Sequence, residues 1–131
     1  VNNHQLAFYD IMPTFCELIG DKKFPKKYLN KKLEGDCFDG ISFVPTLLGK
    51  DEQQQKHDFL YWEFHETDQI GVRMGDWKMV VQGGQCKLFD LANDVHEDHD
   101  VSAKYPVVVE KMKNIIRSAH TENSLFKVTL P

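Results

Sequence analysis

The sequence predicts an α+β fold, in which a four-stranded antiparallel sheet packs with a C-terminal helix and is preceded by an N-terminal helix and an irregular segment. Three observations support this fold class. Apolar residues recur at helical spacing near both ends of the chain, they alternate with polar residues in its middle, and short turns separate the alternating segments. With 131 residues, the chain has the size of a single domain. A boundary at the polar stretch 50–56 divides it into parts 1–56 and 57–131.

The first element is a predicted helix within residues 10–20. Its apolar residues follow a helical spacing, and they are Ile11, Phe15, Leu18 and Ile19. The carboxylate of Asp10 is expected to cap the first turn, where Pro13 is tolerated, and Gly20 suits a left-handed stop. A lysine-rich stretch follows at residues 22–32, and we expect it to be a solvated loop.

Residues 39–49 form a short apolar segment with a glycine near its start and another at its end. This pattern predicts either a packed connector or a single helical turn. Residues 50–56 are polar and contain three consecutive glutamines, so we expect a surface crossing.

The pattern changes to a period of two from His57 onward. Leu60, Trp62 and Phe64 fall on one face of a predicted strand, while Glu63 and His65 fall on the other. Three further strands are predicted at residues 70–74, 77–81 and 86–91, joined by turns that contain glycine or aspartate. Four strands in this succession predict an antiparallel meander.

The last predicted element is a helix that begins at Pro106. Its apolar stripe consists of Val108, Met112, Ile115, Ile116 and Ala119. Such a stripe is typical of a helix that covers one face of a sheet.

Composition excludes several classes of protein. The formal net charge of −4 argues against a general nucleic-acid binder, which needs a basic surface. No segment approaches the roughly 20 apolar residues that a membrane span requires. Three widely spaced cysteines indicate neither a disulfide framework nor a zinc knuckle.

Three clusters suggest chemistry, each with a plainer alternative. Residues 93–100 are rich in histidine and carboxylates and could bind a metal, but their spacing favours a polar connection with capped turns. Glu63 and His65 could act as acid, base or hydrogen-bonding groups in a groove, or belong to an ordinary polar sheet face. The lysine run could attract a sulfated or phosphorylated polymer, although a solvated loop is the better interpretation.

Three stretches resemble, in the same order, the C-terminal part of the sulfatase family. Residues 10–20 (DIMPTFCELIG) resemble a late helix of pattern D-x-x-P-T-hydrophobic-x-x-hydrophobic-x-G. Residues 39–49 (DGISFVPTLLG) resemble a segment D-G-x-S-hydrophobic-x-P-x-L-x-G. The small terminal sheet of the family is matched by residues 60–64 (LYWEF), 72–78 (VRMGDWK) and 88–91 (LFDL), with Asp94 and Glu97.

This resemblance implies that residues 1–56 are the tail of a large catalytic domain and that residues 57–131 are a C-terminal small-sheet subdomain with its covering helix. In the family, a formylglycine made from a C/S-x-P-x-R motif and a bound calcium ion act on the sulfate ester. None of the three cysteines lies in such a motif, and no Asp-Asn-Gly motif is present. We therefore expect these groups in a catalytic domain outside this chain, and an inactive chain by itself. The first residues, which lack an initiator Met, agree with a piece of a longer protein.

The resemblance also implies a role in the hydrolysis of sulfate esters, with a sulfated glycan or an aryl sulfate as substrate. We expect His65, Glu63 and Arg73 near one wall of the substrate pocket, and the missing catalytic domain as the main partner. Without that domain, exposed apolar residues predict self-association or disorder near residues 1–50. Export is expected of many members of the family, so the resemblance implies that the full-length protein is periplasmic or secreted. Two alternatives stay open: a free-standing carbohydrate- or protein-binding module, and a related phosphate or phosphonate ester hydrolase.

Overall fold

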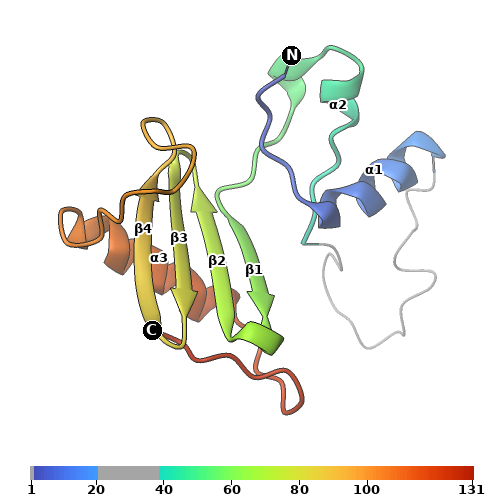
Figure 1. Cartoon of the computed structure of the whole chain (residues 1–131). Helices are drawn as coiled ribbons and strands as arrows, with labels where there is room; N and C mark the ends of the chain where they lie inside the picture. Colours follow the sequence, from blue (N-terminus) through green and yellow to red (C-terminus); the bar gives the residue numbers. More distant parts are fainter. Residues whose placement is uncertain (1, 21–38) are drawn as a thin grey trace. The chain divides into compact units, whose positions relative to one another are not determined.

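The computed structural model describes residues 2–20 and 39–131, which form two compact units. Unit 1 comprises Val1–His57, and unit 2 comprises Asp58–Pro131. Helices and an antiparallel sheet occur together, which confirms the α+β class (Figure 1). The lysine run 22–32 and Cys37 lie outside the described residues.

Unit 1 is built from short helices. A 3-10 turn, η1 (Phe8–Asp10), leads into α1 (Ile11–Leu18), and Gly20 lies just beyond the helix in the left-handed region at φ 71°. The predicted first helix is thus confirmed. In the segment 39–49, the helical turn is correct, because α2 (Val44–Leu47) forms there before a second 3-10 turn, η2 (Asp51–Gln53).

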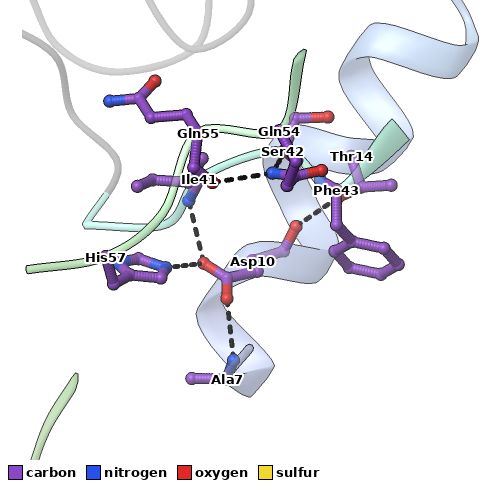
Figure 2. A network of polar contacts seen from close by, with 9 residues as sticks. All are labelled: Ala7, Asp10, Thr14, Ile41, Ser42, Phe43, Gln54, Gln55 and His57. Carbon is purple, nitrogen blue, oxygen red and sulfur yellow. Dashed lines mark hydrogen bonds and ion pairs between the residues drawn. The ribbon is translucent and has the colours of Figure 1, made fainter. Parts of the chain in front are cut away.

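The expected capping role of Asp10 is wrong, because its carboxylate makes no cap to the N-terminus of α1. Instead, the N–H of Ala7 donates to Oδ2 (2.7 Å), and the N–H of Ile41 donates to Oδ1 (2.8 Å). His57 Nε2 lies 2.7 Å from the same Oδ1 (Figure 2). Asp10 is only 1% exposed, so these three contacts replace nearly all of its hydration.

Two further polar side chains complete this network. Thr14 Oγ1 donates to the carbonyl of Asp10 (2.6 Å) and accepts from the N–H of Phe43 (3.0 Å). Gln54 is buried, and its Nε2 donates to the carbonyl of Ser42 (3.0 Å). The expected surface crossing 50–56 is therefore wrong at Gln54, whose amide finds backbone partners inside the unit.

Gly40 allows the two halves of unit 1 to approach closely. A Cβ atom built on Gly40 would lie 2.1 Å from the backbone oxygen of Tyr9, which is far inside contact distance. Only glycine fits there, and its neighbour Ile41 is thereby brought within hydrogen-bonding distance of Asp10.

Unit 2 contains the predicted meander. Its strands are β1 (Leu60–Phe64), β2 (Gln69–Met74), β3 (Trp77–Gln82) and β4 (Gln85–Asp90), hydrogen-bonded in that order and antiparallel throughout. A 3-10 turn, η3 (His65–Thr67), joins β1 to β2. The tight hairpin between β2 and β3 places Gly75 at φ 58°, a conformation that glycine adopts without strain.

The predicted C-terminal helix is confirmed as α3 (Pro106–Ala119), which lies behind the sheet in Figure 1. Met112 and Ile116 of α3 are fully buried against the sheet. The strand residues in this core are Ile70, Val72, Met79, Val81 and Leu88. Because strand side chains alternate, the opposite face carries Trp62 and Phe64, both exposed.

We expect Asp10→Ala to lower the free energy of unfolding of unit 1 by about 3–5 kcal/mol, because it leaves two amides and His57 without their acceptor. Hydrogen exchange of the Phe43 amide, which Thr14 holds, measures the effect. Glu17→Ala, on the exposed side of α1, is the control and should change stability by less than about 0.5 kcal/mol. Unchanged protection in Asp10→Ala would contradict the role of this carboxylate.

Several apolar side chains of unit 1 are exposed, with Phe8 at 89% and Phe15 at 59%. We expect the chain to self-associate at high concentration, because association removes this surface from water. Sedimentation velocity of Phe8→Ser/Phe15→Gln should show a shift toward monomer. Val107→Gln removes an equally exposed apolar group from α3 and should leave the distribution unchanged. A wild-type chain that stays monomeric and ordered at high concentration would refute this expectation.

Candidate functional site

Glu63 joins β1 to the end of α3. It is paired with the buried Ile70, so its side chain lies on the sheet face that α3 covers. The hydroxyl of Tyr61 donates to Glu63 Oε1, and His120 Nδ1 lies 2.7 Å from the same oxygen. One carboxylate therefore orients two polar side chains.

His120 follows α3 directly, and its N–H donates to the carbonyl of Ile116 (2.9 Å). The side chains of His120 and Glu63 are only 16% and 24% exposed. A carboxylate beside Nδ1 favours the tautomer that is protonated there, which leaves Nε2 as a hydrogen-bond acceptor.

Tyr61 is held as a donor by its surroundings. Burial raises the pKa of its hydroxyl, and the hydrogen bond to Glu63 and the charge of that carboxylate raise it further. Tyr61 therefore stays protonated well above neutral pH and keeps donating to Glu63.

The C-terminal segment, residues 120–131, lies near the end of the sheet where η3 is located (Figure 1). Its Phe126 ring contacts the His65 ring edge to face, with centroids 4.7 Å apart. The N–H of Thr129 donates to Asp68 Oδ1 (2.6 Å), and this bond lowers the pKa of Asp68. Val128 packs against the core of the unit.

A hollow of about 750 Å³ lies within this segment. Its lining residues are His120, Glu122, Asn123, Ser124, Phe126, Lys127, Val128 and Leu130. The lining thus combines one aromatic ring, two aliphatic groups, one cation, one carboxylate, an amide and a hydroxyl with the oriented imidazole.

The three predicted site residues, Glu63, His65 and Arg73, do not all lie at the same place in the structure. Glu63 contacts His120 and His65 contacts Phe126, so both support the wall of this hollow. However, β1 ends at Phe64, so His65 lies in η3 and does not share a strand face with Glu63. Arg73 is paired with Leu60, near the start of β1, and its Nε donates to the carbonyl of Gly75 (3.3 Å). A substrate role for the three residues stays a prediction.

Sequence reasoning missed Tyr61 and His120 as members of this cluster. Glu63 and His120 are 57 positions apart, and neither lies in a local motif that links them. A period of two places Tyr61 on the same strand face as Glu63, which was the only available signal.

The acidic cluster 93–100 is a set of capped turns. Asp94 accepts from the N–H groups of Asp98 (3.1 Å) and His99 (2.8 Å), and these bonds lower its pKa. Glu97 forms an ion pair with Lys78 at 2.5 Å. This arrangement supports the plainer interpretation of the cluster.

The sequence has no formylglycine motif, and the residues that the structure describes offer no calcium site. Across residues 2–20 and 39–131, no group of three or more His, Cys, Asp or Glu side chains is arranged to hold a metal ion. Cys16 and Cys86 are free but lie outside a C-x-P-x-R motif. In the same part of the chain, no helix has both the length and the apolar character needed to cross a membrane.

We expect the stability of unit 2 to fall as pH rises above about 10, because Tyr61 then ionises more readily in the unfolded state than in the folded one. Tyr61→Phe should weaken this dependence. Urea unfolding between about pH 9 and pH 11, followed by tryptophan fluorescence, measures it, since Trp62 and Trp77 both lie in unit 2. Tyr105→Phe is the matched control. Cys86, whose pKa burial raises, contributes in the same direction and is unchanged in both variants. Equal slopes in wild type and Tyr61→Phe would contradict the expectation.

Comparison with known proteins gives matches among solved structures only. No family model matches the chain, and no curated protein does. A 2-O GAG sulfatase matches with a TM-score of 0.60 and 21% identity, over 84% of this chain and 23% of that one. A protein designated 6S-sulf, from the metabolism of multiple glycosaminoglycans by Bacteroides thetaiotaomicron, matches with a TM-score of 0.60 and 19% identity, over 84% and 24%.

A third structure, named Ps i-CgsB, matches with a TM-score of 0.62 and 22% identity, over 88% of this chain and 24% of that one. The likeness at these identities concerns the fold. The chain spans about a quarter of the length of the structures it matches, which is consistent with a C-terminal region. This chain has the fold of one part of a sulfatase, which confirms the resemblance that its three motifs predict.

Proposed function

We propose that this chain is the C-terminal part of an enzyme that hydrolyses sulfate esters. The likeness to a 2-O GAG sulfatase over 84% of the chain carries this proposal. The order of the motifs at residues 10–20, 39–49 and 60–91 supports it independently, because these motifs are sequence features and the likeness is one of backbone shape. A sulfated glycan is the substrate class that agrees with the names of the similar structures.

The two compact units support a division of such an enzyme into two parts. Residues 1–56 form the tail of the catalytic domain, and residues 57–131 form the small-sheet subdomain. The exposed Phe8 and Phe15 support the first assignment, since a neighbouring domain would remove them from water. The catalytic domain supplies the calcium ion and the formylglycine, and export places the enzyme in the periplasm or outside the cell.

Arg73 is the residue best suited to meet an anionic group of the substrate. Its bond to Gly75 uses Nε, so that bond leaves both terminal amino groups of the guanidinium unengaged. These groups match the geometry of a sulfate or carboxylate. His65 is 36% exposed and contributes a polar ring, whereas Glu63 acts through His120.

A free-standing binding module is the second candidate. The exposed Trp62 and Phe64 on the open sheet face favour it, because aromatic side chains are common at binding surfaces. Exposure of Tyr61 or Phe59 would favour the binding module, and burial of these side chains under a neighbouring domain would favour the sulfatase. Both side chains are half-buried, so they do not separate the two candidates. A related phosphate or phosphonate ester hydrolase keeps the same architecture with a different pocket.

The gene upstream of the codon for Val1 provides the decisive test. We expect a longer reading frame that contains a C/S-x-P-x-R motif and an Asp-Asn-Gly motif. The longer protein should release sulfate from sulfated glycosaminoglycan disaccharides, whereas residues 1–131 alone should not. A start codon immediately upstream would refute the proposal and favour the binding module.

In the longer protein, we expect Arg73→Ala to lower kcat/KM about tenfold or more, because a charge-assisted hydrogen bond contributes roughly 1.5–3 kcal/mol. Lys87→Ala is the matched control, since Lys87 is an exposed cation on the same sheet face. Equal kcat/KM values for Arg73→Ala and wild type would remove Arg73 from the substrate pocket.

A further inference from the structure

We propose that the hollow within the C-terminal segment is a saccharide-binding site, in which His120 binds a sugar hydroxyl and Phe126 packs against the ring. This site lies after the three motifs that carry the sulfatase resemblance. The proposal rests on the proposed function only for the choice of glycans as test ligands.

The first argument is the orientation of His120. Its Nδ1 is engaged by Glu63, which in turn accepts from Tyr61. A histidine fixed at one nitrogen presents the other in a defined direction. Because His120 lines the hollow, its Nε2 is the nitrogen available to accept from a ligand hydroxyl.

The second argument is the aromatic ring. Phe126 is 52% exposed although it contacts His65 edge to face, so the contact positions the ring without covering it. Leu130 adds an apolar group to the same lining. The C–H face of a pyranose packs against such surfaces, since both are apolar.

The third argument is the match of size and polar groups. A volume of about 750 Å³ falls within the roughly 300–1,000 Å³ typical of ligand sites. Asn123, Ser124 and Glu122 supply both donors and acceptors beside the aromatic ring. A sugar ring, which carries hydroxyls along its edge and C–H groups on its faces, fits this mixture.

The charge of the lining indicates that hydroxyls rather than a sulfate group are recognised. The formal charges of Lys127 and Glu122 cancel, and Glu63 lies behind His120. No net positive charge remains to select an anion. Affinity should therefore depend little on salt and on the sulfation of the ligand.

Contacts with the rest of unit 2 hold the segment in place. Asp68 adopts φ 51° and binds the N–H of Thr129, while Val128 packs on the core. A Cβ atom on Gly84 would lie 3.2 Å from Thr129 Cγ2, so the segment also lies close to the turn between β3 and β4. These contacts hold the lining residues in position in the absence of a ligand.

The test measures binding directly to residues 1–131, by saturation-transfer-difference NMR and calorimetry. The probes are the neutral N,N′-diacetylchitobiose and a sulfated chondroitin disaccharide. We expect both to bind with dissociation constants within threefold of each other, and a rise in salt to about 0.5 M to change either value less than twofold. These experiments measure binding and not hydrolysis, so their result is independent of the sulfatase test.

Variants locate the site. Phe126→Ala and His120→Gln should each weaken binding at least fivefold, while Leu125→Ala and His96→Gln should not. Leu125 is 79% exposed in the same segment but does not line the hollow. Glu63 is a positioning residue, so Glu63→Ala should weaken saccharide binding. Glu63→Gln keeps an acceptor oxygen and should therefore retain most of the wild-type affinity. Tryptophan fluorescence on urea unfolding confirms that each variant is folded.

Three results would overturn the proposal. One is the absence of binding of both disaccharides at about 10 mM. A second is binding of the sulfated disaccharide alone with a steep salt dependence, which would make this an anion site. The third is binding that Phe126→Ala and His120→Gln leave unchanged, which would place the ligand elsewhere.

Discussion

The arrangement of polar side chains at one end of unit 2 depends on the packing of α3 against one face of the sheet. Met112 and Ile116 are fully buried there, so neither the rotation of the helix nor its position along the sheet is free. This packing places His120, the residue that follows the helix, within hydrogen-bonding distance of Glu63 on β1. The apolar packing of α3 therefore determines where the contact between His120 and Glu63 forms, because that contact is too weak to orient a helix of 14 residues.

In unit 1, polar rather than apolar contacts join the elements. Its elements are short, and many of its large apolar side chains are exposed. A buried carboxylate, Asp10, joins three segments through two backbone amides and His57. Gly40 makes this possible, since any side chain there would collide with Tyr9. A few buried polar contacts therefore link the segments of unit 1.

Local pattern predicted most of the fold. The period of two located four strands, and Pro106 with its apolar stripe located α3. One error is local, because β1 ends at Phe64 and His65 lies in η3. The other errors involve side chains whose partners are distant in sequence. Asp10 has the signature of a helix cap but binds Ile41, and Gln54 looks like a surface residue but binds Ser42. The cluster around His120 could not be predicted, because no periodicity relates a strand to a segment beyond a later helix.

A site that recognises hydroxyls has a consequence for an enzyme that removes sulfate. Substrate and product share every sugar hydroxyl except the one that hydrolysis frees at the sulfated position. A site without net positive charge that binds the shared hydroxyls therefore binds both with similar affinity. Such binding does not accelerate the chemical step, because contacts with the shared hydroxyls are equally strong in the ground state and in the transition state. It can hold a polymeric glycan while successive sulfates are removed, since a second contact raises the effective concentration of the chain at the first. Hydrolysis and retention would then be separate properties of one protein, and Phe126 and His120 would govern only the second.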